Sequence, residues 1–309
     1  MKKENFTQLF LDSGAFSAYT QGAEINIQDY IDFIKKHKKK LVVYANLDVI
    51  GDAKGTLKNQ KFMERQGLSP LPCFHMNENF KYLRYYVDKY DYIALGGVAQ
   101  AKGNKNHIIK WMDQCFDVIT DDDGYPKTKV HGFAVTAMDL MFRYPWWSVD
   151  STSWVIWSRM GKIPVPVKKQ GKYLYDRKPL IISVSNKSPD IKDKGSHIDN
   201  ITPTVKKQII QFIEENGMRL GKSEIVEKSL DYQPKDNEKW FEPAKKAKNG
   251  KRLLEIIIES GVSNNYILRD RLSIRFFKNV EKAFPEWPYQ WKHKKRRRGS
   301  LLRGFGYGT

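Results

Sequence analysis

WWSVDSTSW, residues Trp146–Trp154, places the carboxylate of Asp150 directly after a short apolar run. An earlier stretch, LDSGAF (Leu11–Phe16), repeats this arrangement with Asp12. Parallel α/β enzymes hold catalytic groups at the carboxyl ends of buried strands. The two stretches therefore predict two strands that bring carboxylates to one centre for acid/base or nucleophilic work. An Asp-Ser pair after a strand is also typical of a helix N-cap, and that second interpretation stays open.

The stretch YIALGGVAQ (Tyr92–Gln100) is a third signal, because its apolar run leads directly into Gly96 and Gly97. Glycines at a strand end let a flat ligand approach the backbone closely. We therefore expect a ligand to bind where this strand ends.

Alternating strand-like and helix-like patterns between residues 8 and 160 favour βα units around a parallel sheet. The expected strands cover residues 9–11, 41–50, 68–76, 92–98, 130–135 and 146–149, and the expected helices lie near 27–37, 56–66, 80–87, 109–116 and 137–143. Polar candidates follow strands one, two, three, four and six, whereas an open doubly wound sheet would concentrate them at one switch point. We therefore predict an α/β fold, a (β/α)8 barrel of the TIM type, with the open sheet as the alternative.

The second half of the chain carries weaker patterns. Its expected elements are the last two barrel strands or a hairpin insertion at 172–186, a helix at 204–216, an exposed linker at 231–250, a strand or helix at 253–258, and a helix at 263–284. On that last helix we expect four buried apolar side chains, Ile274, Phe277, Val280 and Phe284. The expected domains are a catalytic barrel with a C-terminal helical extension over residues 1–285 and a basic tail over 286–309.

The 309 residues contain 54 Lys and Arg against 35 Asp and Glu, which gives a net charge of +19. This excess favours a polyanionic partner such as nucleic acid, through phosphate neutralisation and counterion release, although a Lys-rich proteome would give the same sign. No apolar run approaches the ~20 residues of a membrane helix, and the N-terminus lacks a signal-peptide apolar region. We expect a cytoplasmic protein without a membrane partner.

Two groups of residues are candidates for contacts to nucleic acid. A dense basic block near the C-terminus can lie along a phosphate backbone or stay a solvated tail. It contains Lys294, Lys295, Arg296, Arg297 and Arg298. Trp154 and Arg159 form the second group, because an aromatic ring near a cation can stack an extruded base. Packing of this tryptophan in the core is an equal alternative.

Three segments in this order, LDSGAF, ALGGVA (94–99) and VHGFAVTAMDLMFRYPWWSVDSTSW (130–154), resemble the tRNA-guanine transglycosylases. The similarity is closer to their DNA-directed relatives, the DpdA-type 7-deazaguanine transglycosylases of bacteria and phages. Residues 263–284 are also similar to the C-terminal Asn-containing helix of the family. The two cysteines, Cys73 and Cys115, cannot supply the three-Cys zinc site of the tRNA enzymes. We therefore expect no zinc subdomain and favour DNA over tRNA.

The resemblance implies the catalytic residues. Asp150 would be the nucleophile that captures the sugar, and Asp12 would be the general acid/base for the leaving and entering bases. Ser13 would orient Asp12. None of these roles needs a cofactor or a metal.

The resemblance also implies how a base is recognised. Asp48 would read the donor edge of a guanine-like base, to which Gly96 and Gly97 would offer backbone groups. His75 stands where the family has Gln, which indicates either a different base or a structural histidine.

The predicted activity is cleavage of an N-glycosidic bond in DNA, with exchange of guanine for a 7-deazaguanine supplied as a free base, by an enzyme of a bacterial cell or its phage. Three alternatives stay open: a DNA glycosylase that excises a modified base in defence against phages, a tRNA-guanine transglycosylase, and a catalytically inactive barrel that binds nucleic acid. The presence of both Asp12 and Asp150 argues against the inactive barrel.

Overall fold

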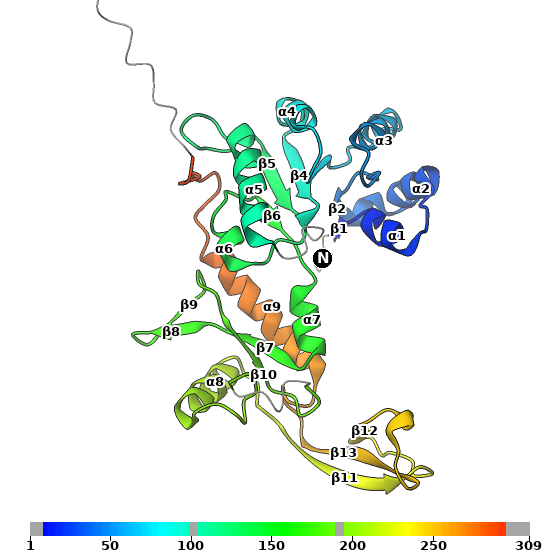
Figure 1. Cartoon of the computed structure of the whole chain (residues 1–309), viewed down its shortest axis with the longest axis vertical. Helices are drawn as coiled ribbons and strands as arrows, with labels where there is room; N and C mark the ends of the chain where they lie inside the picture. The colour runs from blue at the N-terminus through cyan, green and yellow to red at the C-terminus, as the bar shows by residue number, and fades with distance from the viewer. Residues whose placement is uncertain (1–8, 99–103, 189–194, 295–309) are drawn as a thin grey trace, which may run out of the picture. The chain divides into compact units, whose positions relative to one another are not determined.

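A computed structural model describes residues 9–98, 104–188 and 195–294 and has a mixed α/β fold with several small sheets (Figure 1). The chain divides into two compact units, Met1–Ser151 with Glu286–Thr309, and Thr152–Pro285. The segment that follows residue 285 is therefore grouped with the first 151 residues. None of the helices in the described ranges is long and apolar enough to cross a membrane.

Six short parallel strands form the framework of the first unit. They are β1 (Leu9–Leu11), β2 (Leu41–Tyr44), β3 (Cys73–His75), β4 (Tyr92–Gly96), β5 (Lys129–Gly132) and β6 (Ser148–Val149). β1 pairs with β2, and β3 to β6 pair side by side in chain order. An isolated parallel bridge between Ala45 and Leu71 links the end of β2 to the approach of β3. The predicted parallel arrangement is confirmed, and closure into an eight-stranded barrel stays a prediction.

β2 is shorter than its apolar pattern, because after Tyr44 the chain keeps only single backbone bonds to its neighbours, from Ala45 to Leu11 and from Asn46 to Leu71. The buried Asn46 donates its side-chain N–H to the backbone oxygen of Thr56 at 2.9 Å. The hydroxyl of Tyr30 donates to the backbone oxygen of Ala45 at 2.9 Å. These two bonds hold the loop after β2 in place, and that loop carries Asp48.

Helices follow the strands in the first unit. They are α1 (Ala15–Gln21), α2 (Ile27–His37), the 3-10 turn η1 (Lys38–Lys40), α3 (Ala53–Arg65), α4 (Phe80–Lys89), α5 (Lys105–Ile119) and α6 (Met138–Met141). Side chains that accept helix N–H groups start four of them: Asn26, Asp52, Asn79 and Asn104. Ile31 and Ile34 lie on one face of α2 and are fully buried in the core. The sequence pattern does not predict α1, which begins after Gly14 in the left-handed region at φ 73°.

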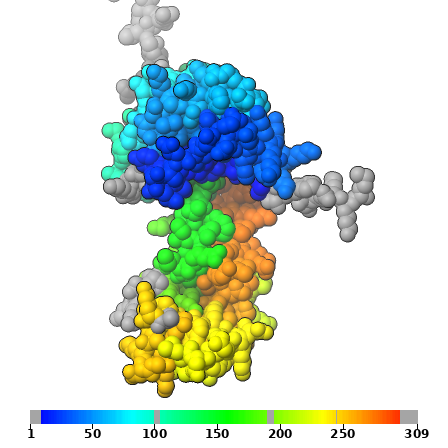
Figure 2. All heavy atoms as spheres, turned by 90° about the vertical axis from the view of Figure 1, so that its right-hand side faces the viewer, coloured from blue at the N-terminus to red at the C-terminus, as the bar shows by residue number. Residues whose placement is uncertain are grey.

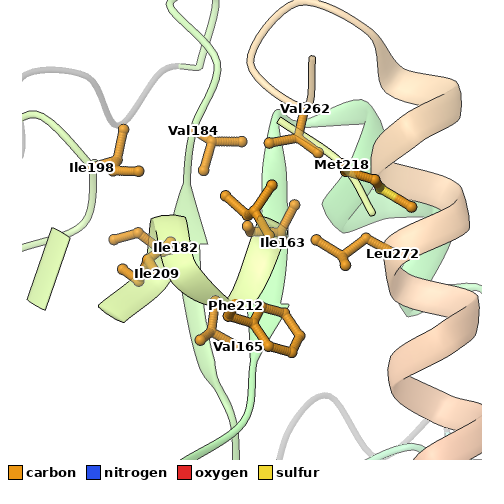
Figure 3. Close-up of a cluster of buried hydrophobic side chains, with 11 residues drawn as sticks. Ile163, Val165, Ile182, Val184, Ile198, Ile209, Phe212, Met218, Val262 and Leu272 are labelled. Atoms are coloured by element: carbon orange, nitrogen blue, oxygen red, sulfur yellow. The ribbon is translucent and has the colours of Figure 1, made fainter. Parts of the chain in front are cut away.

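The second unit combines antiparallel strands with three α-helices in its described residues. Its elements are α7 (Ser153–Arg159), β7 (Lys162–Val165), β8 (Val167–Lys169), β9 (Lys172–Leu174), β10 (Leu180–Ser183), α8 (Pro203–Glu215), β11 (Lys222–Ser229), β12 (Glu238–Trp240), the 3-10 turn η4 (Ala244–Lys246), β13 (Lys251–Glu259) and α9 (Tyr266–Lys282). β10 pairs with β7, and β13 lies between β11 and β12. Figure 3 shows the core, in which Ile163, Phe212 and Leu272 are buried together. α7 and α9 pack side by side (Figures 1 and 2).

Residues 172–186 do not supply two further parallel strands. β9 forms a hairpin with β8, and β10 is antiparallel to β7. The hairpin turn contains Gln170 and Gly171, both at positive φ, which is the geometry that two-residue hairpins favour. The prediction of a linker over 231–250 is wrong in part, because Glu238–Trp240 pairs with β13 as an edge strand.

α9 buries a different face from the predicted one. Ile274 is 46% exposed, Phe277 and Phe284 are half-buried, and Val280 is buried as expected. The buried residues of the helix are Arg269, Leu272, Ser273, Phe276 and Val280. Arg269 belongs to this face because its guanidinium donates to the backbone oxygens of Ser158 and Val262 inside the second unit. A pattern based on apolar residues alone does not reveal such a buried arginine.

Candidate active site

The strand register brings three of the predicted site residues to one end of the sheet. His75 on β3 lies opposite Gly96 on β4. One step before, Leu95 lies opposite Gly132 on β5, which in turn lies opposite Val149 on β6. Asp150 follows Val149 directly, and its backbone N–H donates to the oxygen of Gly132 at 3.2 Å. His75, Gly96 and Asp150 therefore occupy neighbouring strand ends at the same level.

Asp150 is a half-exposed carboxylate that is held from two sides. Its Oδ1 accepts the backbone N–H of Ala134 at 2.9 Å and lies 3.7 Å from Nε2 of His131. Burial acts to raise the pKa of Asp150, but the nearby imidazole of His131 and the hydrogen bond from the Ala134 amide outweigh it and hold that pKa below its usual value. With 53% of its side chain exposed, Asp150 is an ionised group that a substrate can reach.

His131 is fixed by its other neighbours. Its Nδ1 lies 2.7 Å from Oγ of Ser148, and that hydroxyl lies 2.6 Å from the hydroxyl of Tyr92. The ring of Phe10, on β1, stacks against the imidazole with centroids 4.5 Å apart. The sequence suggested only core packing for His131. The structure adds a contact to Asp150 that orients the carboxylate.

A second buried cluster lies where β2 and β3 end. Nε2 of His75 is 3.3 Å from Oδ2 of Asp48 and 3.5 Å from Sγ of Cys73. Nδ1 of His75 is 3.5 Å from Oε1 of Glu78, whose Oε2 accepts the backbone N–H of His75 at 3.1 Å. The side chains of Asp48 and Glu78 are only 8% and 7% exposed. The imidazole is thus enclosed by two carboxylates and a thiol.

Charge in this cluster is governed by burial and by close neighbours. Burial lowers the pKa of His75, but Cys73, Asp48 and Glu78 outweigh it, so that pKa lies well above its usual value. Burial raises the pKa of Asp48, against the opposing effect of His75. Burial also raises the pKa of the Cys73 thiol to about 12. The positive form of His75 is therefore favoured by its acidic neighbours, and the neutral forms of Asp48 and Cys73 are favoured by burial.

Gly96 and Gly97 have separate structural reasons for being glycine. A Cβ at Gly96 would lie 2.8 Å from Cδ2 of His75 and 2.9 Å from Sγ of Cys73, so the cluster fills the space beside this residue. Gly97 has φ 83°, and a Cβ there would lie 3.0 Å from the backbone nitrogen of Met76. The strand end thus packs closely on β3.

Asp12 and Ser13 lie where β1 ends. Asp12 is exposed. Burial is the main cause of the raised pKa values of Tyr30 and Asp48, and the negative charge of Asp12 adds to it in both cases. Ser13 is buried, and its Oγ accepts the backbone N–H of Ala15 at 3.3 Å. Asp12 is therefore electrostatically coupled to the loop that carries Asp48, and Ser13 holds the amide of Ala15 where α1 begins.

The predicted nucleic-acid contacts are distributed over both units. In the second unit Trp154 is half-buried on α7, and the guanidinium carbon of Arg159 lies 3.9 Å from the ring centroid of Tyr266. In the first unit Nζ of Lys294 lies 3.0 Å from Oδ1 of Asp117. The remaining tail cations, Lys295, Arg296, Arg297 and Arg298, lie outside the described residues.

Comparison with known proteins finds no match to a family model, to a curated protein or to a solved structure. The functional argument consequently depends on the geometry of the two clusters. Sequence reasoning missed Cys73 and Glu78 as site residues. The one available signal was the spacing of Cys73 and His75, because residues two apart on a strand point to the same face.

Proposed function

We propose that the chain is an enzyme that breaks the N-glycosidic bond of a base in DNA, with Asp150 as the nucleophile, and exchanges guanine for a 7-deazaguanine. The observation that carries this proposal is the half-exposed Asp150 carboxylate, whose pKa is lowered by His131 and by the amide of Ala134. A nucleophilic carboxylate must be ionised, accessible and fixed in direction. Asp150 meets these three requirements.

The proposed reaction has two steps at the sugar carbon C1′. In the first, Oδ of Asp150 bonds to C1′ as the bond to guanine breaks, through a transition state with oxocarbenium character. Asp12 gives a proton to the departing base. In the second step Asp12 takes a proton from the entering 7-deazaguanine, whose nitrogen displaces Asp150 from C1′. Each step balances without an oxidant or reductant.

Asp12 suits the acid/base role because of its position. It is exposed where β1 ends, and its charge is felt by Asp48 on the neighbouring loop. A proton donor and acceptor must be reachable by both bases in turn. An exposed carboxylate beside the proposed base site satisfies this condition.

Base recognition is proposed for the Asp48 loop. Oδ1 of Asp48 is buried and has no hydrogen-bond partner among the residues that the structure describes. A buried carboxylate oxygen of this kind favours a ligand with N–H donors, such as the edge of a guanine-like base. The glycines at the end of β4 support the same location, because their backbone groups lie beside His75.

We also propose that β1 to β6 are part of a (β/α)8 barrel. β1 and β5 are not neighbours in the strand order, yet the ring of Phe10 stacks on His131. Such a contact needs a strongly curved sheet whose inner faces meet, as in a barrel. In this proposal Asp12, His75 and Asp150 surround one opening at the carboxyl ends of the strands.

DNA is the proposed polymer, in the cytoplasm of a bacterial cell or as a phage product. The net charge of +19 supports a phosphate-rich partner. On the first unit Trp147 is 46% exposed, and Nζ of Lys129 lies 4.1 Å from its ring centroid. An exposed ring with an attached cation suits stacking on a base.

A DNA glycosylase is the second candidate, and His75 favours it. Its imidazole lies against Asp48 and Glu78, so it offers a base different contacts from the glutamine of the resembling family. Hydrolysis would use the same Asp150 intermediate, with water in place of the entering base.

Mass spectrometry of nucleosides and free bases separates the two candidates. The protein is incubated with duplex DNA, single-stranded DNA, base-modified phage DNA and tRNA, each with and without a 7-deazaguanine base. Exchange predicts incorporation of the added base into intact DNA. Release of a base with abasic sites, whether or not a base is added, would establish the glycosylase, and no change in any polymer would refute both.

A further inference from the structure

The ligand atoms of Asp48, Cys73 and His75 all lie within 4.8 Å of one another. Nε2 of His75 is 3.3 Å from Oδ2 of Asp48 and 3.5 Å from Sγ of Cys73. With zinc bonds of about 2.0 Å to nitrogen or oxygen and about 2.3 Å to sulfur, a tetrahedral site holds N and O atoms about 3.3 Å apart and N and S atoms about 3.5 Å apart. The two separations measured from Nε2 are therefore those expected for ligands around one ion, and the third pair, Asp48 and Cys73, lies within 4.8 Å.

A second observation also indicates a ligand at this point. Oδ1 of Asp48 is buried without a hydrogen-bond partner in the described part of the chain, on a side chain that is only 8% exposed. Leaving a carboxylate oxygen unpaired in the interior is costly. A positively charged ligand beside Asp48 removes that cost.

Glu78 supplies the outer contact that metal-binding histidines usually have. Such histidines donate their other ring N–H to a carboxylate or a backbone oxygen, which fixes the direction of the metal-binding nitrogen. Nδ1 of His75 lies 3.5 Å from Oε1 of Glu78, at ion-pair distance and without a hydrogen bond, and Oε2 of Glu78 accepts the backbone N–H of His75. Nε2 is thereby aimed at Asp48 and Cys73.

We propose that Asp48, Cys73 and His75 bind one divalent ion of the zinc class, with a fourth position left for water or a substrate atom. A mixed sulfur, nitrogen and oxygen set suits Zn²⁺ or Co²⁺, whereas Mg²⁺ and Ca²⁺ take oxygen ligands. Three protein ligands with an open position are typical of catalytic zinc sites, and closed structural sites use four.

The site must lose protons when the ion binds. Because the ligands must be deprotonated, the ion takes the place of any proton on Sγ of Cys73 and on Nε2 of His75, and these protons go to solvent without any redox change. The ion site goes beyond the proposed glycosidic chemistry, and it does not depend on that chemistry being correct.

The test uses the full-length protein, purified free of metal and titrated with Zn²⁺ against a chromophoric chelator and, separately, with Co²⁺. We expect one ion per chain, the strong visible absorption of tetrahedral Co²⁺, and a near-ultraviolet band from thiolate-to-cobalt charge transfer. Cys73→Ser should abolish the thiolate band. Cys115→Ser is the matched control, since Cys115 is equally buried but lies on α5, and it should keep both bands.

Two further variants, which should weaken Zn²⁺ binding to different degrees, distinguish an ion site from a cluster that only packs. Glu78→Gln should keep the thiolate band while weakening Zn²⁺ binding by about 10- to 100-fold. Asp48→Asn should weaken it further, because it removes a ligand, and it serves as a second variant if Cys73→Ser does not fold. Circular dichroism of each metal-free variant establishes folding.

Two results would overturn the ion site. One is a wild-type protein that binds no more Zn²⁺ than Cys73→Ser, and the other is a Co²⁺ spectrum that Cys73→Ser leaves unchanged. Asp150→Asn should bind Zn²⁺ as the wild type does, so loss of base exchange in that variant reports on the proposed function alone. The ion site and the glycosidic chemistry can therefore fail independently.

Discussion

The backbone N–H of Ala134 donates a 2.9 Å hydrogen bond to Oδ1 of Asp150 from a residue whose φ is 60°. Alanine in the left-handed region costs about 1–2 kcal/mol relative to the right-handed form. Such local strain persists where surrounding contacts over-determine the backbone, which happens often at functional sites. The chain after β5 is thus bent in a way that aims an amide at the proposed nucleophile.

Ala134→Gly should therefore stabilise the protein without changing its chemistry. Ala134 is exposed, so little packing is lost, and glycine relieves the strain at a smaller entropic cost. We expect the free energy of unfolding to rise by about 0.5–1 kcal/mol in urea titrations. Ala137→Gly is the control, because Ala137 is also exposed but has φ −68°, and it should give no gain. A less stable Ala134→Gly would show that the backbone there is not strained.

The lowered pKa of Asp150 predicts a signature in acid. A carboxylate whose folded pKa lies below its unfolded value of about 3.9 contributes stability that is complete above that pH and is lost as the pH falls through the folded pKa. The stability difference between wild type and Asp150→Asn should shrink as the pH is lowered from about 5 to 3. Urea unfolding of both proteins at several pH values measures this difference in unfolding free energy. A difference that stays constant over this range would mean that His131 and Ala134 do not perturb Asp150.

Gly96→Ala should disturb the cluster around His75. Its Cβ would lie 2.8 Å from Cδ2 of His75, so the imidazole must move, at a cost of about 1–3 kcal/mol in unfolding free energy. His75→Ala removes one of the two obstacles, the other being Sγ of Cys73, and should reduce the cost of Gly96→Ala in the double variant. Unfolding titrations of the wild type, the two single variants and the double variant measure the coupling free energy between Gly96 and His75. Additive effects would indicate that the two residues do not contact each other.

Truncation after Lys294 should weaken DNA binding and flatten its salt dependence. The truncated chain keeps the buried Trp291, whose backbone N–H bonds to Gly124, and the pair between Lys294 and Asp117. The slope of log affinity against log salt should fall by about 0.9 for each removed cation that contacts a phosphate. Fluorescence anisotropy at several salt concentrations measures the slope. An unchanged slope would exclude the tail as a phosphate contact.

The parallel strands could be predicted because short apolar runs such as LFL (Leu9–Leu11) precede polar residues, and such runs placed Asp12, His75 and Asp150 at strand ends. The division into two units could not be predicted from the sequence, because it depends on contacts between distant segments. α1 buries only Ala15 of its seven residues, so no wide apolar face marks it in the sequence. On α9 the buried face differs from the predicted one because it includes Arg269, whose guanidinium donates to backbone oxygens.

The ion-binding cluster was only partly visible. Cys73 and His75 are two residues apart, but Asp48 joins them through the fold of the loop after β2. Glu78 lies in the turn that follows β3, and nothing in its sequence context indicates a contact to the imidazole. Contacts made by loops depend on the tertiary structure, and periodicity does not report them.

Trapping of a covalent intermediate is the most direct test of Asp150 as the nucleophile. Wild type, Asp150→Asn and the control Asp122→Asn, which changes an exposed acid in a turn, are incubated with DNA and quenched with denaturant, and adducts are mapped by peptide mass spectrometry. We predict a DNA adduct on the peptide that contains Asp150 in wild type and Asp122→Asn. In Asp150→Asn we predict no adduct and a loss of exchange of about 10³-fold or more, with DNA affinity retained. Full turnover by Asp150→Asn, or an adduct on another residue, would contradict the account.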